Sequence, residues 1–165
     1  MASEGKYMAY VGSYSYNGKA KGITVYDVDV EKGTFKERCE VEVDNSSYVI
    51  ASSDGKTLYS IADEGVVSFR ILQNGSLARL NSAPIRGMRG CHLCTDMEDK
   101  YVFVSGYHDG KTTVLSLNKW GRLWTRCSTR DTAAWLSATS AHMLPVPEGC
   151  PTAGMFCRWT TERTR

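Results

Sequence analysis

The sequence has no long apolar run: nowhere do about 18 consecutive residues have the composition of a membrane-spanning helix. Its first residues, MASEGKYMAYVGSY, lack the charged segment and apolar stretch of a secretory leader, so we expect a cytoplasmic protein with no membrane partner. The net charge is only +2 over 165 residues, and no stripe of Lys and Arg runs through residues 7–123. Nucleic acid is therefore not an expected partner, because phosphate backbones are bound by basic patches.

Common catalytic signatures are missing too. There is no G-x-S-x-G elbow, no Walker A loop and no Rossmann glycine pattern, so serine-hydrolase, nucleotide and dinucleotide chemistry lack support. Without a leader, the six cysteines are expected to be free thiols. Cys91 and Cys94 flank His92 in a C-x-x-C pattern, but their odd separation on a strand points them to opposite faces, and no second pair completes a zinc site. We expect no metal and no cofactor.

What the sequence does contain is a repeat. The segments GITVYDV from Gly22, GVVSFRI from Gly65 and KTTVLSL from Lys111 alternate in polarity and are rich in β-branched and aromatic residues, as half-buried strands are. They recur at spacings of 43 and 46 residues. Each is followed by a turn that contains glycine and then by another stretch typical of a strand, at EKGTF, QNGSL and KWGRL.

A third correspondence completes the repeating unit. SYVIASSDGKTLYSI from Ser47 aligns without a gap on CHLCTDMEDKYVFVS from Cys91, 44 residues later, and each reads as strand, polar turn, strand. Four strands in about 44 residues are typical of a β-propeller blade. An open meander or a sandwich would give no reason for motifs to return at this period. We therefore predict an all-β fold of antiparallel four-stranded propeller blades, about two and a half of them.

These segments, in this order from Tyr7 to Leu123, resemble the first blades of the lactonase-type seven-bladed propellers, a group that includes 6-phosphogluconolactonase-like enzymes. The resemblance carries an expected function with it. It implies a cytoplasmic hydrolase that acts on a sugar lactone such as 6-phosphogluconolactone, in the pentose phosphate route, without a required metal. The expected partner is this small molecule, and the oligomeric state is left open.

The sequence changes character at Trp124. Residues 124–165 show no repeat motif and hold three of the six cysteines and three of the four tryptophans, which are depleted in disordered tails. We hypothesise that this segment is translated out of frame, because a one-base shift is compatible with DALFDTGYRGLALGN from Trp124 and PDGRYVL from Pro151, which restore a blade pattern. The expected organisation is a partial propeller over 7–123 and an aberrant or unstructured tail over 124–165. An interrupted ring would expose an apolar face at Leu115 and Leu117 and be inactive as it stands.

Five side chains are candidates for the chemistry of such a site. His92, at the start of an inner strand of the third blade, and Glu64, beside Asp63 in the ADEG turn, are candidate bases for activating water. Arg86 and Arg89, in the loop before His92, are candidates for binding a substrate phosphate. Each also has an ordinary structural interpretation as a hydrogen-bonded histidine, a solvated turn or a surface arginine.

Other histidines are weaker candidates. His108 stands before Asp109 and Gly110 in a pattern that favours a hairpin turn, and His142 falls in the segment after Trp124. Two other function classes stay open beside the hydrolase: a non-catalytic propeller that serves as an interaction scaffold, and a non-functional truncated product.

Overall fold

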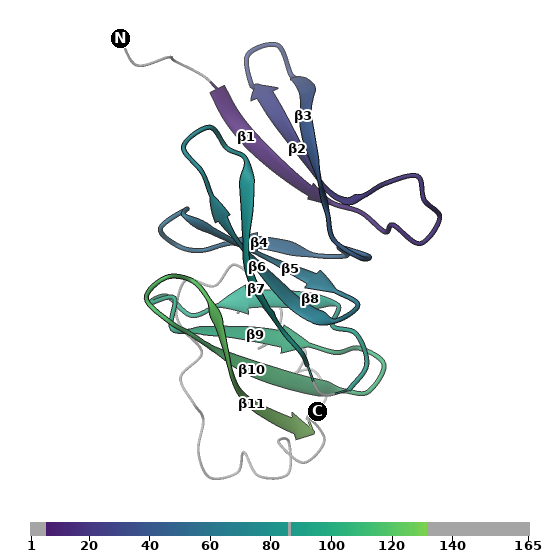
Figure 1. Ribbon diagram of the computed structural model, residues 1–165, viewed down its shortest axis with the longest axis vertical. Helices are drawn as coiled ribbons and strands as arrows, with labels where there is room; N and C mark the ends of the chain where they lie inside the picture. Colours follow the sequence, from purple (N-terminus) through teal and green to yellow (C-terminus); the bar gives the residue numbers. More distant parts are fainter. Residues whose placement is uncertain (1–5, 86, 132–165) are drawn as a thin grey trace, which may run out of the picture.

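The computed structural model describes residues 6–85 and 87–131, and the side chains of residues 7–85 and 87–124. In these ranges the regular elements are eleven β-strands, which form three antiparallel sheets (Figure 1). The described residues contain no helix that could cross a membrane. The prediction of an all-β fold is confirmed.

Each sheet is a meander of strands that follow one another in the chain. Blade 1 contains β1 (Lys6–Gly12), β2 (Gly22–Asp29) and β3 (Thr34–Glu42). Blade 2 contains β4 (Val49–Ala51), β5 (Thr57–Ala62), β6 (Gly65–Ile71) and β7 (Leu77–Ala83). Blade 3 contains β8 (His92–Thr95), β9 (Tyr101–Ser105), β10 (Lys111–Leu117) and β11 (Leu123–Asp131).

The sequence repeat coincides with a structural repeat. The three aligned segments form β2, β6 and β10, and each has an irregularity in its pairing with the following strand, after Val25, Ser68 and Val114 respectively. These three positions are separated by the same 43 and 46 residues as the sequence motifs. The blades therefore share strand order and bulge position, as expected for copies of one unit.

The polar turns between the first two strands of blades 2 and 3 also correspond. Gly55 takes a left-handed conformation with φ of 67°, which suits glycine, and Asp99 adopts the same region at φ of 50° in the equivalent place. The Asp99 carboxylate in turn accepts a hydrogen bond from the Ser53 backbone N–H at 2.9 Å. This hydrogen bond links the turn of blade 3 that contains Asp99 to the turn of blade 2 that contains Ser53.

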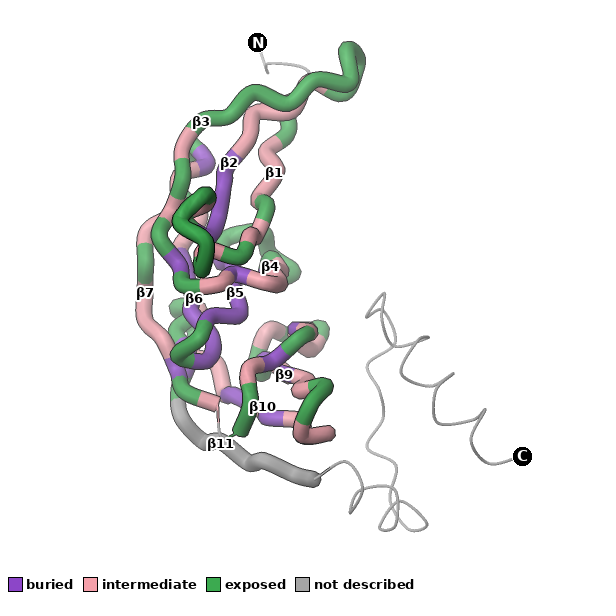
Figure 2. The backbone as a smooth tube through the Cα atoms, turned by 90° about the vertical axis from the view of Figure 1, so that its right-hand side faces the viewer, coloured by how far each residue is buried: buried purple, intermediate pink, exposed green. Residues whose placement is uncertain are grey.

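Blade 2 lies between the other two and buries both of its faces. Alternate residues of β5 point in opposite directions, so Leu58 and Ala62 pack toward blade 1 while Tyr59 and Ile61 pack toward blade 3. Against the first pair lie Ile23 and Val43, with Val67 and Phe69 of β6. Against the second pair lie Leu93, Val102, Val104, Leu115 and Leu123. The core therefore consists of two apolar layers between blades, with β3, β7 and β11 along one outer rim (Figure 2).

The predicted exposure of Leu115 is wrong. Leu115 is fully buried in the layer between blades 2 and 3, and Leu117 is half-buried against the same layer. The reason is the pairing of Leu115 with Val102, which places both side chains on the face that meets blade 2. The opposite, open face of blade 3 carries Phe103 and Val114, which are paired and only half-buried.

Blade 3 is also more complete than the sequence indicated. Strand β11 begins at Leu123 and pairs with β10 as far as Asp131, so the sheet crosses the boundary that the sequence placed after Leu123. About two and a half blades were predicted, whereas the second and third sheets each have four strands. The rest of the expected tail, residues 132–165, lies outside the described residues.

Candidate active site

The inner strands β4 and β8 begin side by side with two ring side chains in contact. Tyr48, just before β4, and His92, the first residue of β8, have ring centroids 4.7 Å apart. His92 is half-buried, and its Nε2 has no hydrogen-bond partner in the described part of the chain. Burial lowers the pKa of the imidazole below its usual 6.5, so His92 is neutral at pH 7 and able to accept a proton.

An ion pair lies at the same end of the sheets. The Arg89 guanidinium, in the connection between β7 and β8, contacts the Asp63 carboxylate at 2.7 Å. It also stands over the ring of Tyr14, 5.1 Å from the centroid. The other oxygen of Asp63 accepts a hydrogen bond from the Asn45 amide at 2.7 Å. Asp63 and Arg89 are thereby held in place by side chains from blade 1 and from the connection to blade 2.

The other candidate residues do not all lie at the end of the sheets that holds His92 and Arg89. Glu64 is bonded to Arg79 on β7, away from the inner strands, and both side chains are about half exposed. His108 is exposed, and its ring lies 5.4 Å from that of the neighbouring Tyr107. Arg86 and His142 lie outside the described residues. Among the five predicted side chains, His92, Arg89 and Asp63 therefore share one end of the sheets, and Glu64 belongs to the outer side of blade 2.

Asp109 has a structural role in the loop before His92. Its carboxylate accepts the Met88 backbone N–H at 2.9 Å, and this bond is the main cause that holds its pKa below the usual range. The expected hairpin-turn role of Asp109 thus extends to the β7–β8 connection, which carries Arg89. The hairpin positions the loop that leads into the inner strand.

The C-x-x-C cysteines do not form a metal site in the described residues, where no cluster of three His, Cys, Asp or Glu side chains is found. The Cys91 thiol is exposed and donates to the Ser105 carbonyl at 3.2 Å. Cys94 is half-buried and is not in a disulfide. Both cysteines therefore act as structural residues of the β8 segment that carries His92.

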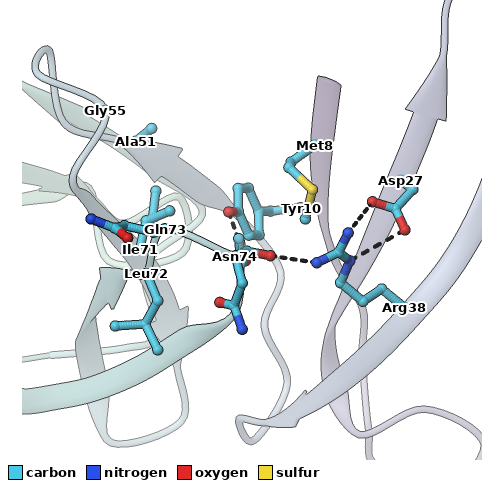
Figure 3. A pocket seen from close by; sticks show the side chains of 11 residues that line it. Met8, Tyr10, Asp27, Arg38, Ala51, Gly55, Ile71, Leu72, Gln73 and Asn74 are labelled. Atoms are coloured by element: carbon cyan, nitrogen blue, oxygen red, sulfur yellow. Dashed lines mark hydrogen bonds and ion pairs between the residues drawn. The ribbon is translucent and has the colours of Figure 1, made fainter. Parts of the chain in front are cut away.

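A cleft of about 580 Å³ lies between blades 1 and 2, at the turns that follow β4 and β6 and so at the opposite end of blade 2 from His92. Arg38 spans it, paired with Asp27 at 2.5 Å and donating to the Asn74 carbonyl at 2.5 Å (Figure 3). Tyr10 donates to the Gly75 carbonyl at 2.9 Å. Arg38 and Tyr10 on blade 1 thus bind backbone carbonyls of the β6–β7 turn and link the two blades across this cleft.

Comparison with known proteins decides the family. The profile of the family described as "Lactonase, 7-bladed beta-propeller" matches residues 8–134, most of the chain. The chain belongs to the lactonase family. The match continues beyond Leu123, in agreement with β11, and this lactonase chain finds no match among the curated proteins.

Solved structures agree with the assignment of the lactonase fold. A protein from Bacteroides fragilis, provisionally named a 6-phosphogluconolactonase, is 30% identical, with a TM-score of 0.69 over 75% of this chain and 36% of its own. One from Bacteroides uniformis with the same provisional name is 25% identical, with a TM-score of 0.72 over 78% of this chain and 38% of its own. The periplasmic gluconolactonase of Pseudomonas aeruginosa, 22% identical with a TM-score of 0.66 over 74% and 38%, shares the fold.

This lactonase chain therefore spans a little over a third of the length of the solved structures it matches. A seven-bladed ring has its inner strands around a central channel, and the described residues supply some of these strands. The described residues therefore make up one sector of such a ring.

Sequence reasoning missed Tyr48, Tyr14 and Asn45. A signal for Tyr48 was present, because the gapless alignment of blades 2 and 3 places Tyr48 on the same position as His92. Tyr14 and Asn45 are in irregular segments, and Asn45 has a positive φ of 52°. No repeat marks these two residues, so only the folded chain shows that they contact the Arg89–Asp63 pair.

Proposed function

We propose that this lactonase chain carries one sector of a site that hydrolyses a sugar lactone, with 6-phosphogluconolactone of the pentose phosphate route as the substrate. The observation that carries the proposal is the geometry of His92 at the start of an inner strand, where its Nε2 is buried and has no hydrogen-bond partner among the described residues. A bound water molecule is the partner that such a nitrogen lacks. A base that attacks through water must be unprotonated at working pH and have a free nitrogen. Membership of the lactonase family supplies the substrate class.

In the proposed step, the His92 Nε2 removes a proton from a water molecule whose oxygen bonds to the lactone carbonyl carbon. The carbon–oxygen bond of the ring then breaks, and the proton passes to the ring oxygen, so a carboxylic acid and a hydroxyl group are formed. Arg89 is about a third exposed beside Asp63, and the edge of its guanidinium that Asp63 leaves open would bind the phosphate of the substrate. Arg86 is proposed as a second phosphate ligand.

Glu64 is the second proposed base, and we rank it behind His92 because its carboxylate already binds Arg79, away from the inner strands. The compartment that we propose is the cytoplasm, although one fold relative is named as periplasmic. We also propose that the segment after Leu123 is read out of frame and that the 165-residue chain is the inactive, truncated form. Against this proposal stand the family match as far as residue 134 and the pairing of β11 with β10 as far as Asp131. Sequencing the gene across Leu123 and Trp124 tests this, and an intact frame in which no one-base correction restores a blade pattern would refute it.

The function is tested by measuring hydrolysis of 6-phosphogluconolactone by the 165-residue chain and by the frame-corrected product. We expect turnover by the corrected product, reduced about 100-fold or more by His92→Gln. His108→Gln is the matched control, because His108 is an exposed turn residue, and it should leave turnover unchanged. The acid limb of kcat/KM should lie below pH 6.5, because His92 must lose its proton first and burial lowers its pKa. Turnover by neither form would favour the interaction scaffold.

A further inference from the structure

Asn45 lies where three loops meet, at the end of the sheets that holds His92. It belongs to the connection between β3 and β4, with Ser15 and Tyr16 in the β1–β2 loop and Asp63 in the β5–β6 turn. The Asn45 Oδ1 accepts the backbone N–H groups of Ser15 at 2.9 Å and of Tyr16 at 3.0 Å. Its Nδ2 donates to the Asp63 Oδ2 at 2.7 Å. One amide therefore joins a loop of blade 1 to a turn of blade 2, through both its oxygen and its nitrogen.

The backbone holds both residues of this contact in place. The φ of Asn45 is 52°, in the left-handed region that asparagine and aspartate enter more readily than most residues. The Asn45 N–H donates to the Ser15 Oγ at 2.9 Å. The Asp63 N–H donates to the Asp44 carbonyl at 3.1 Å. The bond between the Asn45 and Asp63 side chains is thus supported by backbone hydrogen bonds at each of its two residues.

The second oxygen of the Asp63 carboxylate binds the Arg89 guanidinium at 2.7 Å. The guanidinium also stands over the Tyr14 ring, 5.1 Å from its centroid. Asp63 is about half exposed, and an exposed ion pair by itself does little to order two side chains, because both lose rotamer freedom when it forms. A carboxylate that Asn45 already holds has less freedom to lose. The direction of the Arg89 guanidinium therefore depends on Asn45.

We propose that Asn45 is a positioning residue: through Asp63 it fixes the direction of the Arg89 guanidinium, and so it makes the site select a phosphorylated sugar derivative over its unphosphorylated counterpart. The inference rests on the proposed function, which takes Arg89 as a phosphate ligand. A guanidinium binds a phosphate best through two parallel N–H···O bonds, so the orientation of its plane matters as well as its charge. A sugar without a phosphate has no group for Arg89, and its binding does not depend on Asn45.

The substitution Asn45→Asp changes one bond of this arrangement. Aspartate also tolerates a positive φ, and its carboxylate still accepts from Ser15 and Tyr16. It replaces the donor to Asp63 by a second carboxylate oxygen, however, and two neighbouring carboxylates repel each other. Asp63 should then leave its position beside Arg89.

Asn118→Asp is the matched control. The Asn118 Oδ1 likewise accepts two backbone N–H groups, those of Trp120 at 2.9 Å and Arg122 at 3.0 Å. It lies in the turn between β10 and β11, at the end of blade 3 opposite to His92. This control adds the same charge to the same kind of turn, away from the candidate site.

The test is an NMR titration of the 165-residue chain, followed at the Arg89 Nε–H group. The probes are 6-phosphogluconate and gluconate, which differ only in the phosphate. We expect 6-phosphogluconate to shift the Arg89 resonance and gluconate to leave it in place. Asn45→Asp should raise the Kd of 6-phosphogluconate at least about 5-fold, because an oriented, charge-assisted contact is lost. Relaxation of the Arg89 Nε–H should also show greater motion, and Asn118→Asp should change neither quantity.

An exchange of the two side chains separates positioning from simple loss of structure. The double variant Asn45→Asp, Asp63→Asn keeps the total charge and restores a donor and an acceptor between the two positions, so it should recover part of the affinity and order lost in Asn45→Asp. Urea unfolding shows whether each variant is folded. If Asn45→Asp does not fold, Asn45→Gly takes its place, because glycine also suits the positive φ.

Several results would overturn the inference. They are an Arg89 resonance that 6-phosphogluconate does not shift at millimolar concentration, an unchanged Kd in Asn45→Asp, a raised Kd with unchanged motion of Arg89, an equal effect of Asn118→Asp, or no recovery in the double variant. Binding of 6-phosphogluconate that depends on Asn45, without lactone hydrolysis by the frame-corrected product, would refute the proposed function and support this inference.

Discussion

Two valines on paired strands of blade 3 provide a direct test of the face assignment. Val104 on β9 is 1% exposed and packs in the layer against blade 2, whereas Val114 on β10 is half-buried on the opposite, open face. Both are in strand centres, so Val→Ala removes the same atoms and the same β-propensity from each. Any difference in the free energy of unfolding reports the difference in burial.

The magnitude follows from the groups removed. Two buried methyl-sized groups at about 0.8 kcal/mol each give about 1.6 kcal/mol for Val104→Ala. The cavity left between two packed sheets raises the cost to about 2–3 kcal/mol. At Val114 the removed groups are partly in water already and leave no closed cavity, so the cost should be below about 1 kcal/mol.

The assay is urea unfolding of both variants and the parent, followed by tryptophan fluorescence and circular dichroism and compared at equal m-value. A cost at Val114 equal to or above that at Val104 would show that the face assigned as open is in fact covered. It would also contradict the assignment of Leu115, rather than Val114, to the face of β10 that meets blade 2. A parent without a cooperative transition would refute the claim that the layer between blades 2 and 3 is a packed core.

Two further predictions concern the same layer. Gly90→Ala should destabilise the chain by about 1–3 kcal/mol, because a Cβ at this position would lie 2.5 Å from a methyl carbon of Val104, and Val104→Ala in the same chain should recover part of the loss in urea unfolding. Tyr59 should stay protonated in an absorbance titration at pH values where a tyrosine in water ionises, because burial raises its pKa well above 10.0. Stability should accordingly be full below pH 10 and fall above it, since only the unfolded chain then releases this proton. Ionisation of Tyr59 in the native protein at the same pH as in the urea-unfolded chain would contradict its burial.

The sequence was sufficient for the architecture because the blades repeat. The 43- and 46-residue spacings placed β2, β6 and β10, and the aligned pair of segments placed the inner strands. It was insufficient at β11, because the residues after Leu123 lack the alternation by which the other strands were found. Backbone pairing with β10 forms that strand without a matching pattern of side chains.

The sequence also did not predict which face of β10 each apolar side chain occupies. Leu115 and Val114 are adjacent apolar residues, and composition does not say which of them meets blade 2. The register with β9 decides it, because Leu115 pairs with the fully buried Val102. For the site, the repeat was enough to select His92, but the partners of Glu64 and Arg89 depend on which end and which side of a blade each loop occupies.

At one equivalent position, the two layers between blades place the glycine on opposite sides of the contact. Between blades 1 and 2, Gly12 leaves room for Ser46, whose hydroxyl contacts that of Ser60 at 2.7 Å. Between blades 2 and 3, the bulky Ile61 stands in the place of Gly12, since Gly12 pairs with Ile23 and Ile61 pairs with the equivalent Val66. Gly90, 44 residues after Ser46, stands in the place of that serine. A gene that duplicated or exchanged single blades would bring Ile61 against a serine or leave Gly12 facing a glycine. Once the copies had diverged in this way, each blade fitted only its own neighbours, so their order in the chain could no longer be changed by recombination without loss of packing.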